Sequence, residues 1–139
     1  MQILSTSNEE IDQRLAGGIP HPSFIIIEGD HGSGKTAVSL LFTQAYLQAN
    51  LTVTYFTSEG DGYSFVLKAQ QSGFNIIDYY LKGRLNVYSM SVAMSISKDL
   101  ANIMLKKITD ILVKKIVDTD AIVIDSLSYL AGASTDYIR

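Results

Sequence analysis

Eight consecutive residues carry the clearest chemical signal in this sequence. They match the pattern G-x-x-x-x-G-K-[ST] at every fixed position. In chain order they are Gly29, Asp30, His31, Gly32, Ser33, Gly34, Lys35 and Thr36. Glycines let backbone N–H groups point at phosphate oxygens, while Lys35 supplies a positive charge and Thr36 a hydroxyl ligand for Mg²⁺. The pattern predicts a P-loop that binds a nucleoside triphosphate with magnesium. The alternative is a glycine-rich turn with an unrelated lysine.

A second candidate is the carboxylate of Asp125. It follows the apolar run 121–124, a pattern typical of a central parallel strand that delivers an acid to its carboxyl end. This is a Walker B pattern, in which Asp125 holds Mg²⁺ through the water shell of the ion. In the alternative interpretation Asp125 is a structural acid at a turn.

A third candidate, Glu59, follows the β-branched and aromatic segment 52–58, which predicts a strand. Because the carboxyl ends of parallel strands meet at one edge of a sheet, Glu59 is a candidate to orient or deprotonate the water that attacks the γ-phosphate. The alternative is a solvated acid in the glycine-rich turn 59–62.

The two histidines give weaker signals. His31 either touches the γ-phosphate or a neighbouring subunit, or it occupies a variable position of the loop. His21 lies between Pro20 and Pro22 and is interpreted as a rigid turn residue. With no cysteine and no H-E-x-x-H pattern, the sequence gives no support to a zinc site.

The elements that position these residues alternate between strand and helix. A buried strand is predicted before the loop and a helix after it, as a P-loop requires. The alternation predicts an α/β fold with a mostly parallel central sheet flanked by helices, in a single domain over 1–139. The expected elements are a strand at 23–28, a helix at 37–49, a strand at 52–58, a helix at 63–72 ended by Gly73, an aromatic connector at 75–83, and strands at 85–90 and 120–126.

Two amphipathic helices complete the expected layout. The first covers 7–18, where Ser7 and Glu10 have capping-box spacing and Ile11 and Leu15 share one face. The second covers 98–117 and is either a solvated helix covering the sheet or a basic binding patch. Its expected buried stripe is Leu100, Met104, Ile108, Ile111 and Leu112, and its expected polar side is Lys106, Lys107, Asp110 and Lys114.

Composition excludes several classes of protein. With 47% hydrophobic and 18% charged residues the chain is not a disordered tail, and without cysteine it is not a disulfide scaffold. A net charge of −3 argues against a surface that coats nucleic acid. The apolar runs are too short to span a bilayer, so any membrane contact is expected to be peripheral.

Four segments together resemble the RecA/RadA/KaiC class of ATPases: residues 7–20, the P-loop, residues 55–60 and residues 122–127. Within that class the sequence is most similar to the FlaH family, the KaiC-like ATP-binding components of the archaeal flagellum (archaellum) motor. The resemblance implies a RecA-like core that binds ATP and Mg²⁺, with Gly29 to Thr36 as Walker A, Asp125 as Walker B and Glu59 as catalytic glutamate. KaiC relatives usually carry paired glutamates where this chain has Ser58 and Glu59, so weak or conditional hydrolysis is expected.

The same resemblance implies a cytoplasmic protein that forms a homo-oligomeric ring, with ATP occupancy acting as a switch. Its implied partners are the archaellum motor ATPase and a membrane-embedded platform protein. The alternatives are a RadA-like DNA recombinase and a KaiC-like signalling ATPase. A RecA core has further strands after Walker B, so the 139 residues are expected to be C-terminally incomplete as such a core.

Overall fold

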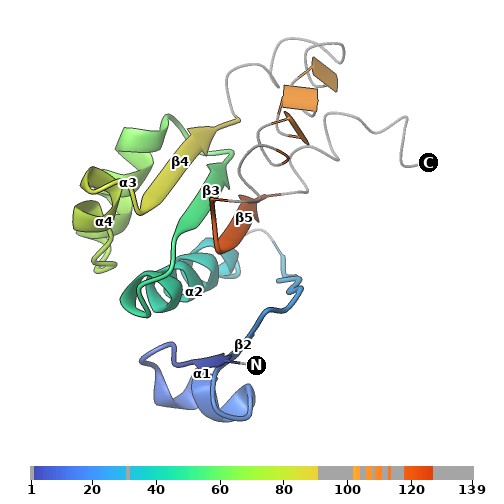
Figure 1. The fold of residues 1–139 in the computed structure, drawn as a ribbon, viewed down its shortest axis with the longest axis vertical. Coiled ribbons are helices and arrows are strands. Elements are labelled where there is room, and N and C mark those ends of the chain that lie inside the picture. The colour runs from blue at the N-terminus through green and yellow to red at the C-terminus, as the bar shows by residue number, and fades with distance from the viewer. Residues whose placement is uncertain are drawn as a thin grey trace.

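A computed structural model describes residues 2–30, 32–90 and 118–126, together with 102–103, 106–107, 109–110 and 113. Strands and helices alternate through most of this chain, which confirms the predicted α/β class (Figure 1). The elements are β1 (Gln2–Leu4), α1 (Glu9–Arg14), β2 (Ile19–His21), α2 (Lys35–Gln48), β3 (Val53–Thr57), α3 (Gly62–Gln71), α4 (Ile77–Leu81), β4 (Leu85–Ser89) and β5 (Ala121–Asp125).

The central sheet has three parallel strands in the order β4-β3-β5. β3 is paired along both edges, and all five of its residues are buried. The register places Thr57 opposite Ser89 of β4 and opposite Asp125 of β5. The predicted strands at 52–58, 85–90 and 120–126 are therefore confirmed, and their carboxyl ends share one edge of the sheet.

The hydrophobic core lies between one face of this sheet and the helices α2, α3 and α4. Alternate strand residues point to opposite faces of a sheet, and Val53 and Tyr55 of β3 belong to the core cluster. Helix α2 contributes Leu40 and Leu47 to the same cluster. Figure 1 shows α3 and α4 beside β4, with α2 alongside β3 and β5. The helix that leaves the loop is thus packed directly on the strands that carry the candidate acids.

Helix α3 follows the predicted boundaries because its ends carry specific signals. The side chain of Asp61 caps the amino end by accepting a hydrogen bond from the Ser64 N–H at 2.9 Å, and Gly73 beyond the carboxyl end has φ of +100°. The prediction of a connector at 75–83 was incomplete, because this segment contains the short helix α4. The side-chain oxygen of Gln70 accepts the N–H groups of Ile76 and Ile77, just where this short helix begins.

The prediction of a strand at 23–28 is wrong. The segment forms no strand, and all of its side chains except Ile27 are exposed, with Phe24 90% and Ile26 67% exposed. A strand requires a neighbouring ladder of hydrogen bonds. β5 pairs with β3, and within the described residues it does not pair with the 23–28 segment, which lines one cavity together with β5. The β-branched residues that suggested a strand therefore lie along a cavity instead of inside a sheet.

The amino-terminal segment folds into a small unit that the sequence analysis only partly predicted. β1 and β2 pair antiparallel, with Ile3 opposite Pro20, and α1 connects them. The helix is shorter than the predicted 7–18, and Asn8 is its N-cap instead of Ser7, since the Asn8 side chain accepts from the Ile11 N–H at 3.1 Å. The interpretation of His21 as a turn residue is also wrong, because His21 lies in β2.

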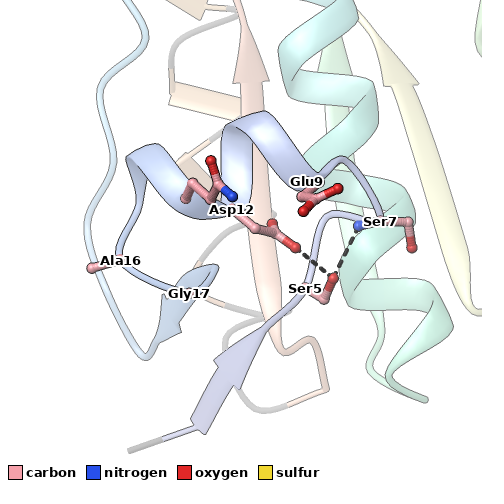
Figure 2. Close-up of a pocket in the computed structure, with 7 residues that line it drawn as sticks. Ser5, Ser7, Glu9, Asp12, Ala16 and Gly17 are labelled. Atoms are coloured by element: carbon pink, nitrogen blue, oxygen red, sulfur yellow. Dashed lines mark hydrogen bonds between the residues drawn. The ribbon is translucent and has the colours of Figure 1, made fainter.

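Asp12 of α1 holds this unit together by accepting hydrogen bonds from the segment that follows β1. The Ser5 hydroxyl donates to one of its oxygens at 2.6 Å, and the Thr6 N–H and hydroxyl donate to the other at 2.9 and 2.7 Å. These hydrogen bonds lower the pKa of Asp12, and the bond from Ser5 has the largest effect. Figure 2 shows Ser5 between Asp12 and Ser7. These residues line a hollow of about 630 Å³. The Asp12 carboxylate therefore serves the local fold.

The predicted helix at 98–117 lies mostly outside the described residues, as do its expected buried stripe and Lys114. The described positions from 102 to 113 are helical, and Lys106, Lys107 and Asp110 are exposed as predicted. Within the described residues, no helix is both long and apolar enough to cross a membrane.

Gly18→Ala is expected to destabilise the amino-terminal unit. A Cβ at Gly18, where φ is +144°, would collide with the backbone carbonyl oxygen of Leu4. The matched control is Gly73→Ala, which has a positive φ of +100° but open space around a Cβ. We expect Gly18→Ala to cost about 1–3 kcal/mol more than Gly73→Ala in denaturant unfolding. Equal losses of unfolding free energy in the two variants would show that the Leu4 backbone moves away from the added Cβ at no cost in stability.

Candidate functional site

The loop at 29–36 has the backbone geometry that its glycines were predicted to allow. Gly32 and Gly34 adopt positive φ values of +81° and +93°. α2 begins at Lys35, and its N-cap, Gly34, has no side chain to accept from the first turn. The N–H groups at the start of α2 are therefore available to an anion such as phosphate.

Gly29 is the first residue of the loop and follows directly on the 23–28 segment. A Cβ at Gly29 would collide with the hydroxyl oxygen of Ser33, and the Ser33 N–H donates to the Asp30 carbonyl at 3.0 Å. The loop is therefore a tight turn in which the Ser33 side chain would have to rotate away from a Cβ at this position. A glycine at this position matches the P-loop pattern, in which the backbone approaches the phosphates closely.

Lys35 lies over this turn. Its Nζ donates to the Gly29 carbonyl at 2.5 Å and lies 3.4 Å from the Asp30 carbonyl. The ammonium is thus held at the mouth of the loop, where it places a positive charge beside the free N–H groups of α2. Thr36 follows in the first turn of α2 and is half-buried.

Asp125 ends β5 and is almost fully buried, with 9% of its surface exposed. Its Oδ2 accepts a hydrogen bond from the Tyr55 hydroxyl at 2.8 Å, and its backbone carbonyl accepts from the Ser58 N–H at 2.8 Å. The peptide bond between Asp125 and Ser126 is cis. In the described part of the chain, no lysine or arginine forms an ion pair with Asp125.

Tyr55 is the partner that sequence reasoning missed. Its ring is fully buried, and burial, followed by the charge and hydrogen bond of Asp125, raises the pKa of its hydroxyl far above the usual range. The hydroxyl therefore remains a protonated donor at physiological pH. The only sequence signal was its position in β3, which places the tyrosine on the helix-covered face two residues before the end of the strand.

One cavity of about 780 Å³ brings the loop and the acid together. Gly29, Lys35 and Asp125 all line it, from the loop, the start of α2 and the end of β5. Its volume is in the range of small-molecule sites. Apolar side chains form another part of the lining, including Phe24 and Ile26 of the segment before the loop. The cavity therefore offers a polar end with both a cation and a carboxylate, and an apolar wall.

The other described residues of the predicted site do not line this cavity; they are Asp30, Gly32, Ser33, Gly34, Thr36 and Glu59. Glu59 is exposed beyond the end of β3, where its N–H donates to the Thr57 hydroxyl at 3.0 Å, and it does not line the cavity. It does lie near the shared carboxyl edge of the sheet, two residues after Thr57. His31 lies outside the described residues, so its predicted contact with phosphate or a neighbouring subunit stays a prediction.

Comparison with known proteins agrees with the loop and the sheet. The family model described as the KaiC ATPase matches residues 4–139. The archaeal flagellar ATP-binding protein FlaH of Sulfolobus acidocaldarius is 35% identical over 135 residues, covering 96% of this chain and 58% of the relative. FlaH of Methanocaldococcus jannaschii is 31% identical over 130 residues, covering 91% of this chain and 53% of the relative.

The crystal structure of the flagellar accessory protein FlaH from Methanocaldococcus jannaschii superimposes with a TM-score of 0.67 at 25% identity. That match covers 95% of this chain and 58% of the solved chain, so this chain spans little more than half the length of these relatives. The family match covers nearly all 139 residues, including the P-loop and β5. The chain therefore belongs to the KaiC-like ATPase family.

Proposed function

We propose that this protein binds ATP with Mg²⁺ in the cavity between the 29–36 loop and β5. The observation that carries this proposal is that Lys35 and Asp125 line the same cavity although 90 positions separate them in the sequence. A cation beside helix N–H groups suits the phosphates, and a buried carboxylate that pairs with no lysine or arginine of the described residues suits a divalent cation.

Each residue of the loop and of the strand end has a distinct role in this proposal. The N–H groups from Gly29 to Thr36 hold the phosphate oxygens, and Lys35 moves from the loop carbonyls to the β- and γ-phosphates. The Thr36 hydroxyl and the Asp125 carboxylate hold Mg²⁺, the latter through water. Magnesium, when bound, neutralises phosphate charge and orients the triphosphate.

We further propose that ATP occupancy, and not rapid turnover, is the signal. Glu59 is the candidate that orients or deprotonates the attacking water, yet it is exposed and outside the cavity. Ser58 stands before it where KaiC relatives usually carry a second glutamate. Both features support slow hydrolysis, because a general base acts only within hydrogen-bonding reach of its water.

The cellular role rests on the relatives, which are named as archaeal flagellar ATP-binding proteins and as a flagellar accessory protein. We propose that this protein serves an archaellum motor complex as a cytoplasmic, ring-forming subunit. In that role it docks on a membrane-embedded platform protein and a motor ATPase, and it meets the membrane only through them.

Lys35→Ala is expected to weaken ATP binding about 10- to 100-fold, because it removes a charge-assisted contact with the phosphates. Titration of the full-length protein with a fluorescent ATP analogue measures this loss. Lys68→Ala, at an exposed lysine of α3, is the matched control and should bind normally. If Lys35→Ala bound the ATP analogue with wild-type affinity, the loop would not be part of the binding site.

Asp125→Asn is expected to weaken ATP binding about tenfold or more in the presence of Mg²⁺ and to leave binding in EDTA nearly unchanged. The reason is that Asp125 acts through the ion and does not touch the phosphates. The control is Asp118→Asn, which neutralises an exposed acid three residues before β5. Equal losses with and without Mg²⁺ would instead make Asp125 a structural residue.

Glu59→Gln is expected to abolish the residual ATP hydrolysis while sparing ATP binding and oligomer formation. The substitution keeps the size of the side chain and removes its basicity. Steady-state ATPase assays and light-scattering mass measurement of the full-length protein test both parts, with Glu9→Gln on α1 as the control. Rapid turnover by the wild type, or an oligomer that forms equally without nucleotide, would contradict the occupancy switch.

A further inference from the structure

Tyr55 makes a contact that the family match and the motifs do not explain. Its hydroxyl donates to Oδ2 of Asp125 at 2.8 Å, and both side chains are buried or nearly so. We propose that Tyr55 is a positioning residue, which holds the Asp125 carboxylate so that its other oxygen, Oδ1, serves the magnesium shell. This inference rests on the proposed function, because it takes Asp125 as the acid that holds the ion.

The surroundings of Tyr55 fix the position of its hydroxyl. β3 is hydrogen-bonded on both edges, so the Tyr55 backbone has a neighbour on each side, Val87 and Val123. Its ring packs against the ring of Phe65 in α3, with centroids 4.9 Å apart. A side chain held in this way has lost its rotamer freedom on folding, so its hydroxyl is a preorganised donor.

Helix α2, which begins at the loop, also lies close to this donor. Ser39 of α2 acts on the Tyr55 hydroxyl by lowering its pKa, against the larger effects of burial and Asp125, and Ser39 lines the same cavity as Asp125. Ser39 lies four residues after Lys35, on the same side of α2. Tyr55 and its acceptor Asp125 therefore lie beside α2, the helix that carries Lys35 and Thr36 and that contacts β5 directly.

The choice of a tyrosine suits a cation site. A lysine or arginine in this place would neutralise Asp125, whereas a neutral hydroxyl orients the carboxylate and leaves its negative charge for the ion. Asp125 lines the cavity with no ion pair to a described lysine or arginine. Partners that orient metal-binding side chains typically account for 10- to 100-fold in metal affinity.

Tyr55→Phe tests the role because it removes only the hydroxyl. The measurement is the Mg²⁺ concentration that half-saturates tight binding of a non-hydrolysable ATP analogue to the full-length protein. We expect this concentration to rise about tenfold, while affinity for the analogue in EDTA stays the same. Unchanged Mg²⁺ dependence, or an equal loss of affinity in EDTA, would overturn the proposal.

Thr54→Val is the matched control. Thr54 is fully buried in the same strand and its hydroxyl donates to the Thr119 hydroxyl at 3.1 Å, but it points to the opposite face of the sheet. We expect it to lower thermal stability, as loss of a buried hydrogen bond does, and to keep the wild-type Mg²⁺ dependence. A shift in Mg²⁺ dependence equal to that of Tyr55→Phe would make the effect a general consequence of weakening β3.

The double variant Y55F/D125N separates this inference from the proposed function. If Tyr55 acts through Asp125, adding Tyr55→Phe to Asp125→Asn should shift the half-saturating Mg²⁺ concentration by less than twofold. Full additivity would show that Tyr55 acts elsewhere. A normal Mg²⁺ response in Asp125→Asn alone would overturn the magnesium assignment of the proposed function, and with it this inference. A shift in Asp125→Asn without one in Tyr55→Phe would overturn this inference only.

Discussion

The pairing of β3 with a parallel strand on each edge is the constraint on which the candidate site depends. The register that sets Thr57 opposite Asp125 also sets Tyr55 two residues back on the same face. Side chains alternate along a strand, so a slip of one residue would turn Asp125 to the opposite face, away from α2. Burial of all five β3 residues makes such a slip costly. The geometry of the acid is therefore a property of the sheet and not of β5 alone.

The two charges of the site lie at the ends of secondary-structure elements, one at the start of a helix and one at the end of a strand. Lys35 begins a helix, where free N–H groups already favour an anion, and Asp125 ends a strand. Burying a carboxylate costs free energy unless hydrogen bonds or a counter-charge compensate it. Here the hydrogen bond of Tyr55 compensates only part of this cost, and no cation of the described residues pairs with Asp125. A divalent cation would supply the rest, which gives ion binding a physical reason beyond the motif.

Local patterns in the sequence predicted the loop, α2, α3 and the three strands of the sheet, because glycines, caps and β-branched runs act over a few residues. The segment 23–28 shows the limit of such patterns. Its residues favour a strand, yet whether a ladder forms depends on a neighbour that local sequence does not specify. Tyr55 was missed for a related reason, since its partner Asp125 is 70 residues away. His21 was taken for a turn residue because prolines flank it, although it pairs in β2 and contacts the Tyr46 hydroxyl at 3.0 Å.

The central claim is that the 29–36 loop and Asp125 form one magnesium–nucleotide site. A crystal structure of the full-length protein with a non-hydrolysable ATP analogue and Mn²⁺ tests it most directly, because the anomalous scattering of Mn²⁺ locates the ion without assumptions about the residues around it. We expect phosphates on the loop N–H groups and on Lys35, with the Mn²⁺ peak beside Thr36 and on the Asp125 side of the cavity. Phosphates bound elsewhere, or an ion remote from Asp125, would contradict it.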